Sequence, residues 1–555
     1  MRLTWGQRIW LPVLALWLTV ALFGAILCFP VPLLDPDEGL HAAIAQEMVE
    51  SHDWLTPHLL GQSFLDKPIL FFWLQAFSLR TFGMSEGAVR LPGLVCGLLG
   101  AITAGWLAGR MFGRATGVFT GFFQATLFLP LALTQAAVHD VALVPWTNLA
   151  LWCCWEFERR PNLRDGLRWA LGIGACLGAA ILTKGLIGAV FVLLTWGAAS
   201  MLEHWRRESH WTIHRRPIEY VGVLQRMLAS SELGTRVLVL GIALATAVLI
   251  AAPWYALMEY RHPGYVHYYF VQRHVMGFVS EAQRHGGSPW WYYLPLLALG
   301  GLPWIAYLPV GMRQAWTQRR AGWESGNEAR LWCWCWLLSG VLFLSIARVK
   351  LLTYMLPLFP AVAMLGADVW TQWFDDRLNA QARQWLVAIW RATSFAAPAM
   401  LPVGIAGVQL AYGIVIPVGT WCGIVLLSLI GMLPAWRWRR GPSLEALATA
   451  GAVLGLYMLV LTGTVVPQVA ARTTGRDLAE LLAEQSEGPP RVIFLENRVG
   501  SVAFYLPRKL RAGLQRDDFQ EMKVQRYVAE RTPRPDLLLV VPEDELDDVG
   551  EHLPV

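Results

Sequence analysis

The amino-acid sequence predicts a polytopic α-helical membrane protein with a small α/β domain at its C-terminal end. The chain has 555 residues, of which 55% are hydrophobic and only 15% are charged, and its mean hydropathy is +0.42. In a typical soluble protein, about 25% of the residues are charged. The apolar residues also form uncharged runs, such as 9–29 and 237–258. Each run is long enough to cross a hydrocarbon core of about 30 Å as a helix.

Runs of this kind recur through the first 466 residues. They predict about 13 membrane spans, near residues 9–29, 89–109, 115–135, 140–157, 168–184, 186–203, 235–258, 289–311, 331–347, 351–369, 393–414, 415–436 and 443–466. The first run is longer than the apolar core of a signal peptide, and no small-residue cleavage site follows it. We therefore expect it to be retained.

Arginines in short connections predict how the spans are oriented. They precede the first span and fall in every second connection, which the positive-inside rule assigns to the cytoplasm. The N-terminus is then cytoplasmic and residues 1–466 form the membrane domain. The loops 30–88 and 259–288 and the tail 467–555 lie on the opposite, outer face.

The tail differs in composition from the rest of the chain. Residues 476–485 have the pattern of an amphipathic helix, and 491–495 and 536–541 that of buried strands. We therefore expect a small α/β domain at 467–555. Neither a Walker-type loop nor a GxGxxG turn in a βαβ setting is present, which argues against an ATP-driven pump and predicts no nucleotide cofactor. The net charge of +5 requires no nucleic-acid partner, and the cysteine spacing predicts neither disulfides nor a zinc site.

Three carboxylates, Asp35, Asp37 and Glu38, follow the first span directly. Ionisable groups at the membrane boundary are candidates for function, and Pro36 stiffens the backbone between them. Such a cluster can hold a divalent cation, orient an acceptor or act as a general base. The alternative is that these acids only supply negative charge at the start of a helix over residues 40–50.

The chain has only five lysines, and three of them, Lys67, Lys184 and Lys350, map to the outer face. Lysine binds phosphate as a compact point charge, so this grouping indicates a phosphate pocket. Isolated lysines that extend to the headgroup layer are the alternative. Asp140 lies at the same level in an apolar run, where a carboxylate is costly unless it is paired.

The loop 259–288 mixes aromatic and basic residues, among them Arg273. Arginine offers two parallel donors to phosphate, and aromatic faces stack on sugar rings. An interfacial aromatic belt is the simpler interpretation. Further along, Lys350 and Tyr354 are spaced i,i+4, which would place them on one helical face.

Several motifs together resemble the bacterial ArnT-like family of the GT-C superfamily, which includes protein O-mannosyltransferases. They are Pro36-Asp37-Glu38, Gln46-Glu47-Met48 with Asp53-Trp54, Asp66-Lys67-Pro68, Arg90-Leu91-Pro92, Thr183-Lys184-Gly185, Lys350 to Tyr354 and Ser501 to Leu506. That family moves 4-amino-4-deoxy-L-arabinose from undecaprenyl phosphate to lipid A. His41 departs from the family, which usually has an aromatic residue there, and Ile69 replaces a second proline.

The resemblance and the residue patterns together give expected roles to eight residues. The expected catalytic residues are Asp37, Glu38 and Asp140, and those expected to bind the carrier phosphate or substrate are Lys67, Lys184, Arg273, Lys350 and Tyr354. A divalent metal ion is an open option, with Asp37, Glu38 and His41 as candidate ligands.

The sequence thus predicts a glycosyltransferase of the bacterial inner membrane that uses a polyprenyl-phosphate-linked sugar and acts on lipid A or another envelope acceptor among the membrane lipids. Two alternatives stay open. One is an O-mannosyltransferase-like enzyme with a protein or glycan acceptor. The other is a transporter or flippase for lipid-linked sugars, which predicts charged residues at mid-depth in several spans.

Overall fold

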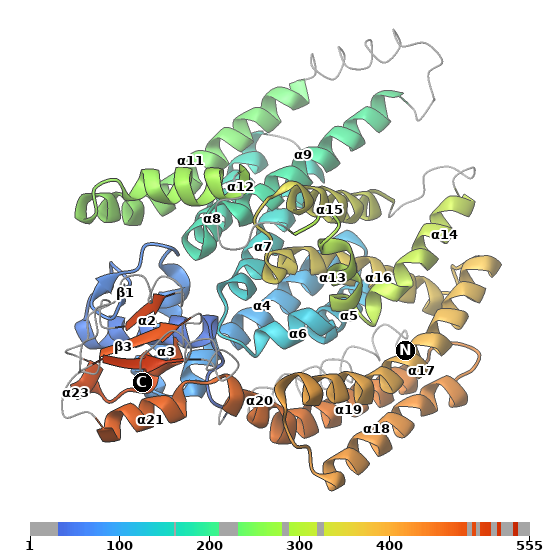
Figure 1. Ribbon diagram of the computed structural model, residues 1–555. Coiled ribbons are helices and arrows are strands. Elements are labelled where there is room, and N and C mark those ends of the chain that lie inside the picture. The colour runs from blue at the N-terminus through green and yellow to red at the C-terminus, as the bar shows by residue number, and fades with distance from the viewer. Residues whose placement is uncertain are drawn as a thin grey trace.

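The computed structural model describes residues 31–159, 163–209, 231–279, 288–318, 327–485, 491–495, 500–511, 519–522 and 537–541. It is an assembly of long helices with a small sheet at one side (Figure 1). The helices of the main bundle are α4 (Glu86–Met111), α5 (Arg114–Thr126), α6 (Phe128–Thr134), α7 (His139–Arg159), α8 (Leu163–Lys184), α9 (Leu186–Ser209), α11 (Ser231–Arg261), α13 (Tyr293–Gly300), α14 (Leu308–Gln318), α15 (Asn327–Ile346), α16 (Phe359–Phe374), α17 (Ala380–Tyr412), α18 (Val418–Arg437), α19 (Leu444–Val460) and α20 (Val466–Thr473).

The bundle has the length and composition of a multi-pass membrane protein. Nine helices within the described residues are long and apolar enough to cross a bilayer, or up to eleven if each of two bent helix pairs is one span. The pair α5–α6 bends by 63°. The prediction of a polytopic helical protein is confirmed. The count of about 13 stays a prediction, and the expected span at 9–29 lies outside the described residues.

Apolar side chains on the outside of the bundle fit a lipid environment. Leu249 on α11 is 75% exposed and Leu410 on α17 is 84% exposed, which water would penalise and lipid does not. Inside the bundle, small residues let helices approach closely. A Cβ added to Gly117 of α5 would lie 2.6 Å from the carbonyl oxygen of Gly105 on α4, so these two helices pack backbone to backbone.

One end of the bundle carries a buried ion-pair cluster that the sequence did not predict. Glu158 accepts hydrogen bonds from Arg236, from the Trp196 indole at 2.8 Å and from the Ser200 hydroxyl at 2.8 Å. These bonds join α7, α9 and α11. Every partner of this carboxylate is another side chain of the bundle, so we interpret the cluster as a structural link between helices.

The first loop folds into short elements rather than remaining irregular. It contains α2 (Asp37–Ser51), a hairpin of β1 (His58–Leu59) and β2 (Gln62–Ser63), and α3 (Leu70–Phe82). The helix expected at 40–50 is confirmed and begins three residues earlier, at Asp37. The loop after α11 forms a π-helical segment, η1 (His267–Met276), and the short α12 (Gly277–Val279).

The C-terminal segment contains a parallel sheet in the order β4-β3-β5. Its elements are α21 (Arg476–Gln485), β3 (Arg491–Leu495), α22 (Ser501–Tyr505), α23 (Arg508–Arg511), β4 (Phe519–Met522) and β5 (Leu537–Val540). The predicted helix at 476–485 and the predicted strands are confirmed. Figure 1 shows these strands beside α2 and α3, the helices of the first loop. Whether the segment is an independent domain stays a prediction.

Candidate functional site

The three carboxylates of the first loop have three different environments. Asp37 begins α2, where the helix N-terminus favours negative charge, and its side chain is exposed. Glu38, the next residue, is only 3% exposed. Asp35 precedes the helix and bonds to Ser501 in the C-terminal segment. Adjacent acids therefore point in different directions, and only Asp37 faces open space.

Glu38 is bound on all sides by protein groups. Arg90 of α4 donates to it from Nε at 2.8 Å and from Nη2 at 2.7 Å, and the backbone N–H groups of Leu34 and Ala137 donate at 2.8 and 3.2 Å. Arg90 also donates to the carbonyl groups of Val31 and Pro32, at the start of the loop. This geometry fixes the loop on α4 and leaves Glu38 no free lone pair for a substrate. Glu38 therefore holds the loop in place, and the catalytic role expected for it stays a prediction.

The candidate metal ligands do not converge. Among the described residues, no group of three His, Cys, Asp or Glu side chains could hold a metal ion. Glu38 is committed to Arg90, and Nδ1 of His41 contacts the carbonyl oxygen of Ala137 at 3.0 Å. Of the set Asp37, Glu38 and His41, this leaves the Asp37 carboxylate and the Nε2 atom of His41, which are too few donors for a protein-built metal site.

A buried ion pair joins two adjacent helices of the bundle near this loop. The Lys184 ammonium at the end of α8 pairs with the Asp140 carboxylate in the first turn of α7, and both side chains are 7% exposed. The Tyr354 ring lies 4.5 Å from the Lys184 Nζ atom, at cation–π distance. Tyr354 comes from η3 (Leu352–Leu358). Three residues predicted for the site therefore meet at one point.

Asp37 and Lys67 belong to the same charged region. Lys184 interacts electrostatically with both of them, and Tyr354 interacts with Asp37, Asp140 and Arg273. Within the described chain, neither Asp37 nor Lys67 forms an ion pair or a side-chain hydrogen bond. As far as the structure describes the chain, the region thus holds one acid and one base without an ion-pair partner.

Arg273 forms an ion pair with Asp66, the residue just before Lys67. Its Nη2 lies 3.0 Å from the Asp66 carboxylate, which also accepts a hydrogen bond from the Tyr268 hydroxyl at 2.5 Å. Both partners of Asp66 come from η1. Asp66 therefore links the two outer loops, and Arg273 and Lys67 both act electrostatically on the His274 side chain.

Two carboxylates, those of Glu47 and Asp53, hold the first loop in its path toward Lys67. Glu47 of α2 accepts from the N–H groups of Leu60 and Gly61 at 2.7 and 2.8 Å, which secures the tip of the hairpin. Asp53 accepts from the N–H group of Leu55 at 2.9 Å and pairs with Arg261 of α11 at 2.7 Å. Two acids of the sequence motifs thus fold the loop rather than take part in chemistry.

Gly185 allows the Lys184 backbone to lie directly under η1. Its φ of +84° is in the left-handed region, and an added Cβ would lie 2.3 Å from Nε2 of His274 and 2.8 Å from the Tyr269 hydroxyl. His274 is fixed in turn by a 2.7 Å contact between its Nδ1 and the carbonyl oxygen of Tyr269. Glycine is therefore required both for the turn and for the space.

Lys350 lies apart from these contacts. Its ammonium donates to the carbonyl oxygens of Ala347 and Ser288, so it closes the end of α15. The expectation that Lys350 and Tyr354 share a helical face is wrong, because η3 begins at Leu352 and Leu351 is extended, with ψ of 141°. No contact in the described residues joins Lys350 to Lys184 or Asp140, and its role in binding stays a prediction.

His41 is buried beneath the charged region. Its ring makes edge contacts with His139 at 4.4 Å and with Phe72 at 5.8 Å between centroids. Burial lowers the pKa of His41 to about 4, although the Asp37 carboxylate acts in the opposite direction. The imidazole is therefore neutral at pH 7, and it packs here as the aromatic residue usual in the family would.

Three residues of this region were not predicted as site residues. Arg90 and Asp66 stood in the motifs, but nothing in the sequence identified their partners. Ser501 lies far from the first loop in the chain, and only the tertiary contact with Asp35 reveals it. Hydrogen-bond partners at this separation cannot be derived from periodicity or spacing.

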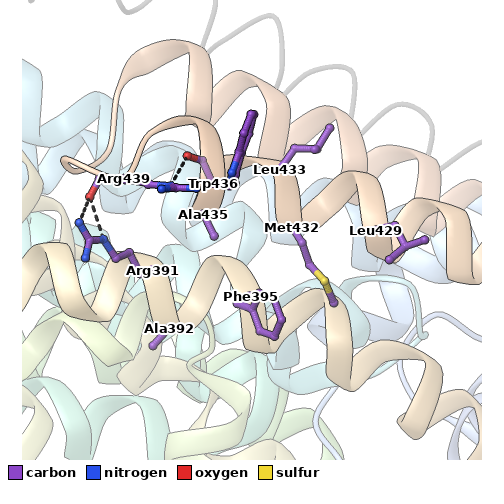
Figure 2. Close-up of a pocket in the computed structure, with 9 residues that line it drawn as sticks. All are labelled: Arg391, Ala392, Phe395, Leu429, Met432, Leu433, Ala435, Trp436 and Arg439. Carbon is purple, nitrogen blue, oxygen red and sulfur yellow. Dashed lines mark hydrogen bonds between the residues drawn. The ribbon is translucent and has the colours of Figure 1, made fainter.

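A groove of about 810 Å³ lies elsewhere, between α17 and α18 (Figure 2). Arg391 donates to the carbonyl oxygen of Arg439 across it at 2.8 and 2.5 Å, and Phe395 and Trp436 line its apolar part. None of the predicted site residues lines this groove.

The helical bundle has the composition of a multi-pass membrane protein, and a charged cluster lies beside its loops. The sequence profile of the family described as dolichyl-phosphate-mannose-protein mannosyltransferase matches residues 41–269. The fold is that of the crystal structure of ArnT from Cupriavidus metallidurans bound to undecaprenyl phosphate, with a TM-score of 0.70 and 21% identity over 98% of this chain and 95% of that chain.

Two relatives carry the name undecaprenyl phosphate-alpha-4-amino-4-deoxy-L-arabinose arabinosyl transferase. The Aeromonas hydrophila protein is 32% identical over 60% of this chain, but the match spans only 56% of that protein's own length. The Pectobacterium atrosepticum protein is 28% identical over 81% of this chain and 75% of its own. The chain is thus similar in sequence to ArnT-like proteins and shares the ArnT fold, which agrees with the resemblance that its motifs carry.

Proposed function

We propose that the protein is a glycosyltransferase that moves a sugar from undecaprenyl phosphate to lipid A or another envelope acceptor. The relatives named above are arabinosyl transferases, so 4-amino-4-deoxy-L-arabinose is the first sugar to test. In this proposal residues 1–466 form the catalytic membrane domain in the bacterial inner membrane. The N-terminus is cytoplasmic, and residues 467–555 form a periplasmic domain.

The observation that carries the proposal is the unpaired ammonium of Lys67. Among the described residues this cation has no counter-ion, and together with the guanidinium of Arg273 it is suited to a phosphate. The Lys184–Asp140 pair, by contrast, is internally neutral and buried. Lys67 and Arg273 therefore bind the carrier phosphate in this proposal, and Lys184 keeps Asp140 and Tyr354 in place around it.

The transfer follows from these positions. An acceptor oxygen attacks the anomeric carbon of the sugar, and the bond from that carbon to the phosphate oxygen breaks. Undecaprenyl phosphate leaves with the electron pair, and Lys67 and Arg273 stabilise its added negative charge. A hydroxyl acceptor gives its proton to the Asp37 carboxylate. A lipid A phosphate acceptor needs no base at pH 7, and Asp37 then orients it.

The described residues supply one uncommitted carboxylate, Asp37, for a divalent metal ion. Metal dependence is therefore tested by chelation of the purified enzyme rather than assigned to a protein site. Loss of transfer in chelator, with recovery on adding the ion, would support an ion held between Asp37 and the phosphates.

Lipid A mass spectrometry with and without the gene tests the acceptor. The proposal expects a mass increment of one 4-amino-4-deoxy-L-arabinose on lipid A that appears only with the gene. If lipid A is unchanged and an envelope protein or glycan gains the sugar instead, the O-mannosyltransferase-like alternative is correct. Movement of the lipid-linked sugar across proteoliposomes without any covalent product would favour a flippase.

A further inference from the structure

The turn that carries Asp37 is held from the C-terminal segment. Both carboxylate oxygens of Asp35 bond to Ser501, one to its backbone N–H at 2.8 Å and the other to its hydroxyl. These two residues are 466 positions apart in the chain. Asp35 lies two residues before Asp37, so the bond acts on the turn from which α2 begins.

The direction of the Ser501 hydroxyl is fixed by a third group. Its oxygen accepts a hydrogen bond from the N–H group of Gly475 at 2.7 Å, so its own proton is donated to Asp35. The N–H group of Asp35 donates to the carbonyl oxygen of Thr473 at 3.3 Å. The turn is therefore bonded both to the end of α20 and to the start of α22.

Two glycines bring α22 against the first turn of α2. A Cβ on Gly39 would lie 2.4 Å from the backbone nitrogen of Ser501, and a Cβ on Gly500 would lie 2.9 Å from the backbone nitrogen of Leu40. Real side chains do not approach this closely, so the backbones are in direct contact. Ser501 itself is 0% exposed, and α22 leaves the first turn of α2 no room to move toward it.

Asp37 has no other support within the described residues. Its side chain is exposed and forms no ion pair or side-chain hydrogen bond, so its position follows the backbone of this turn alone. Burial raises the pKa of the neighbouring Asp35 to about 6, against the hydrogen bonds from Ser501.

We propose that Ser501 is a positioning residue for transfer, which acts through Asp35 to hold the Asp37 carboxylate against the acceptor. The proposal rests on the function proposed above and adds a residue of the C-terminal segment to it. A displacement of about 1 Å at a catalytic group costs up to roughly a hundredfold in rate. We expect loss of the Ser501–Asp35 contact to lower kcat and not the affinity for the carrier, because the groups that bind the carrier phosphate lie on other elements.

The test compares Ser501→Ala, Asp35→Asn and the double variant with Glu50→Gln in proteoliposomes. Glu50 accepts from Arg511 Nη2 at 2.5 Å at the far end of α2, so Glu50→Gln also loosens the C-terminal segment but leaves the turn intact. The measured quantities are the thermal midpoint, the affinity for undecaprenyl phosphate, and kcat for transfer of the sugar from undecaprenyl phosphate to lipid A.

Ser501→Ala and Asp35→Asn are each expected to lower kcat by roughly tenfold to a hundredfold with unchanged carrier affinity. The double variant should be no worse than the single ones, since both remove one interaction. Glu50→Gln should lower the thermal midpoint without lowering kcat. Unchanged kcat in Ser501→Ala, or an equal loss in Glu50→Gln, would overturn the proposal.

Two comparisons keep the result interpretable. If Ser501→Ala does not fold, Asp35→Asn removes the same interaction from the other side, and the same loss of kcat is expected. Asp37→Asn is measured in parallel. Full transfer by that variant would reject the proposed role of Asp37, whereas an inactive Asp37→Asn beside a fully active Ser501→Ala would reject the positioning role alone.

Discussion

The ammonium of Lys184 and the carboxylate of Asp140 form a buried ion pair between the last residue of α8 and the first turn of α7. Breaking a buried pair on one side leaves an uncompensated charge and costs about 3–5 kcal/mol, whereas replacing both partners costs much less. The two residues are therefore coupled in stability as well as in the proposed chemistry.

Lys184→Met is expected to destabilise the protein by about 3–5 kcal/mol, because Asp140 is left buried and unpaired. Lys184→Met combined with Asp140→Asn should recover most of that stability but not the transfer of sugar. Thermal unfolding in detergent, with transfer measured on the folded fraction, checks both statements. Recovery of activity in the double variant would show that the pair is only structural.

Glu38→Gln separates the structural role of Glu38 from the catalytic role predicted from the sequence. The amide keeps the shape but loses the charge opposite Arg90, so a stability loss on the order of 3 kcal/mol is expected. The fraction that folds should keep kcat within a factor of about 3, less than 1 kcal/mol in the barrier. A folded Glu38→Gln variant without transfer activity would support the catalytic role predicted for Glu38.

Gly185→Ala is expected to impair carrier binding as well as stability. Left-handed backbone costs a non-glycine residue roughly 1–2 kcal/mol, and the new Cβ must also displace His274 from η1. Gly413→Ala is the control, because Gly413 is left-handed, with φ of 59° and ψ of 28°, and has no atom within 4 Å of an added Cβ. Equal effects of the two variants on the affinity for undecaprenyl phosphate would show that the contact with His274 is unimportant.

Because of His41, we expect the stability of the folded protein to fall on acidification. Its pKa is about 4 in the folded protein and 6.5 in the reference state, so the unfolded chain binds more protons between these values. The contribution of His41 is complete above pH 6.5 and is lost as the pH falls toward 4, at up to about 1.4 kcal/mol per pH unit. His41→Phe should make this slope smaller, measured as the difference in thermal midpoint from pH 7 to 5.

Asp35 has the opposite effect on stability over part of the same pH range. Its pKa rises from 3.8 to about 6 on folding, so the folded protein binds the extra proton and this contribution is lost as the pH rises through 6. Asp35→Asn should therefore steepen the loss of stability on acidification. If the thermal midpoint of His41→Phe falls on acidification as steeply as that of the unsubstituted protein, the contribution assigned to His41 is wrong.

The sequence predicted the helices well because apolar length and period are local properties. It also brought Asp37, Asp140, Lys67 and Lys184 to one region through topology and resemblance. It could not say which of three adjacent acids faces outward. That depends on Arg90, which comes from α4 and fully engages Glu38.

Other errors have the same origin in long-range contacts. The i,i+4 spacing of Lys350 and Tyr354 predicted a shared helical face, but Leu351 is extended and η3 begins after it. Similarly, nothing near Asp35 in the chain indicates Ser501. The buried cluster around Glu158 shows that charged groups also gather away from the candidate site, so charge alone did not distinguish chemistry from structure.

The central claim is that the uncommitted Asp37 carboxylate and Lys67 ammonium act on one bound carrier. Sugar transfer and undecaprenyl phosphate binding by Asp37→Asn and Lys67→Ala, measured side by side in proteoliposomes, test it most directly. Asp37→Asn should bind the carrier normally and transfer nothing, while Lys67→Ala should bind it at least about tenfold more weakly, a loss of roughly 1.4 kcal/mol. Full transfer by folded Asp37→Asn, with normal carrier affinity in Lys67→Ala, would contradict it.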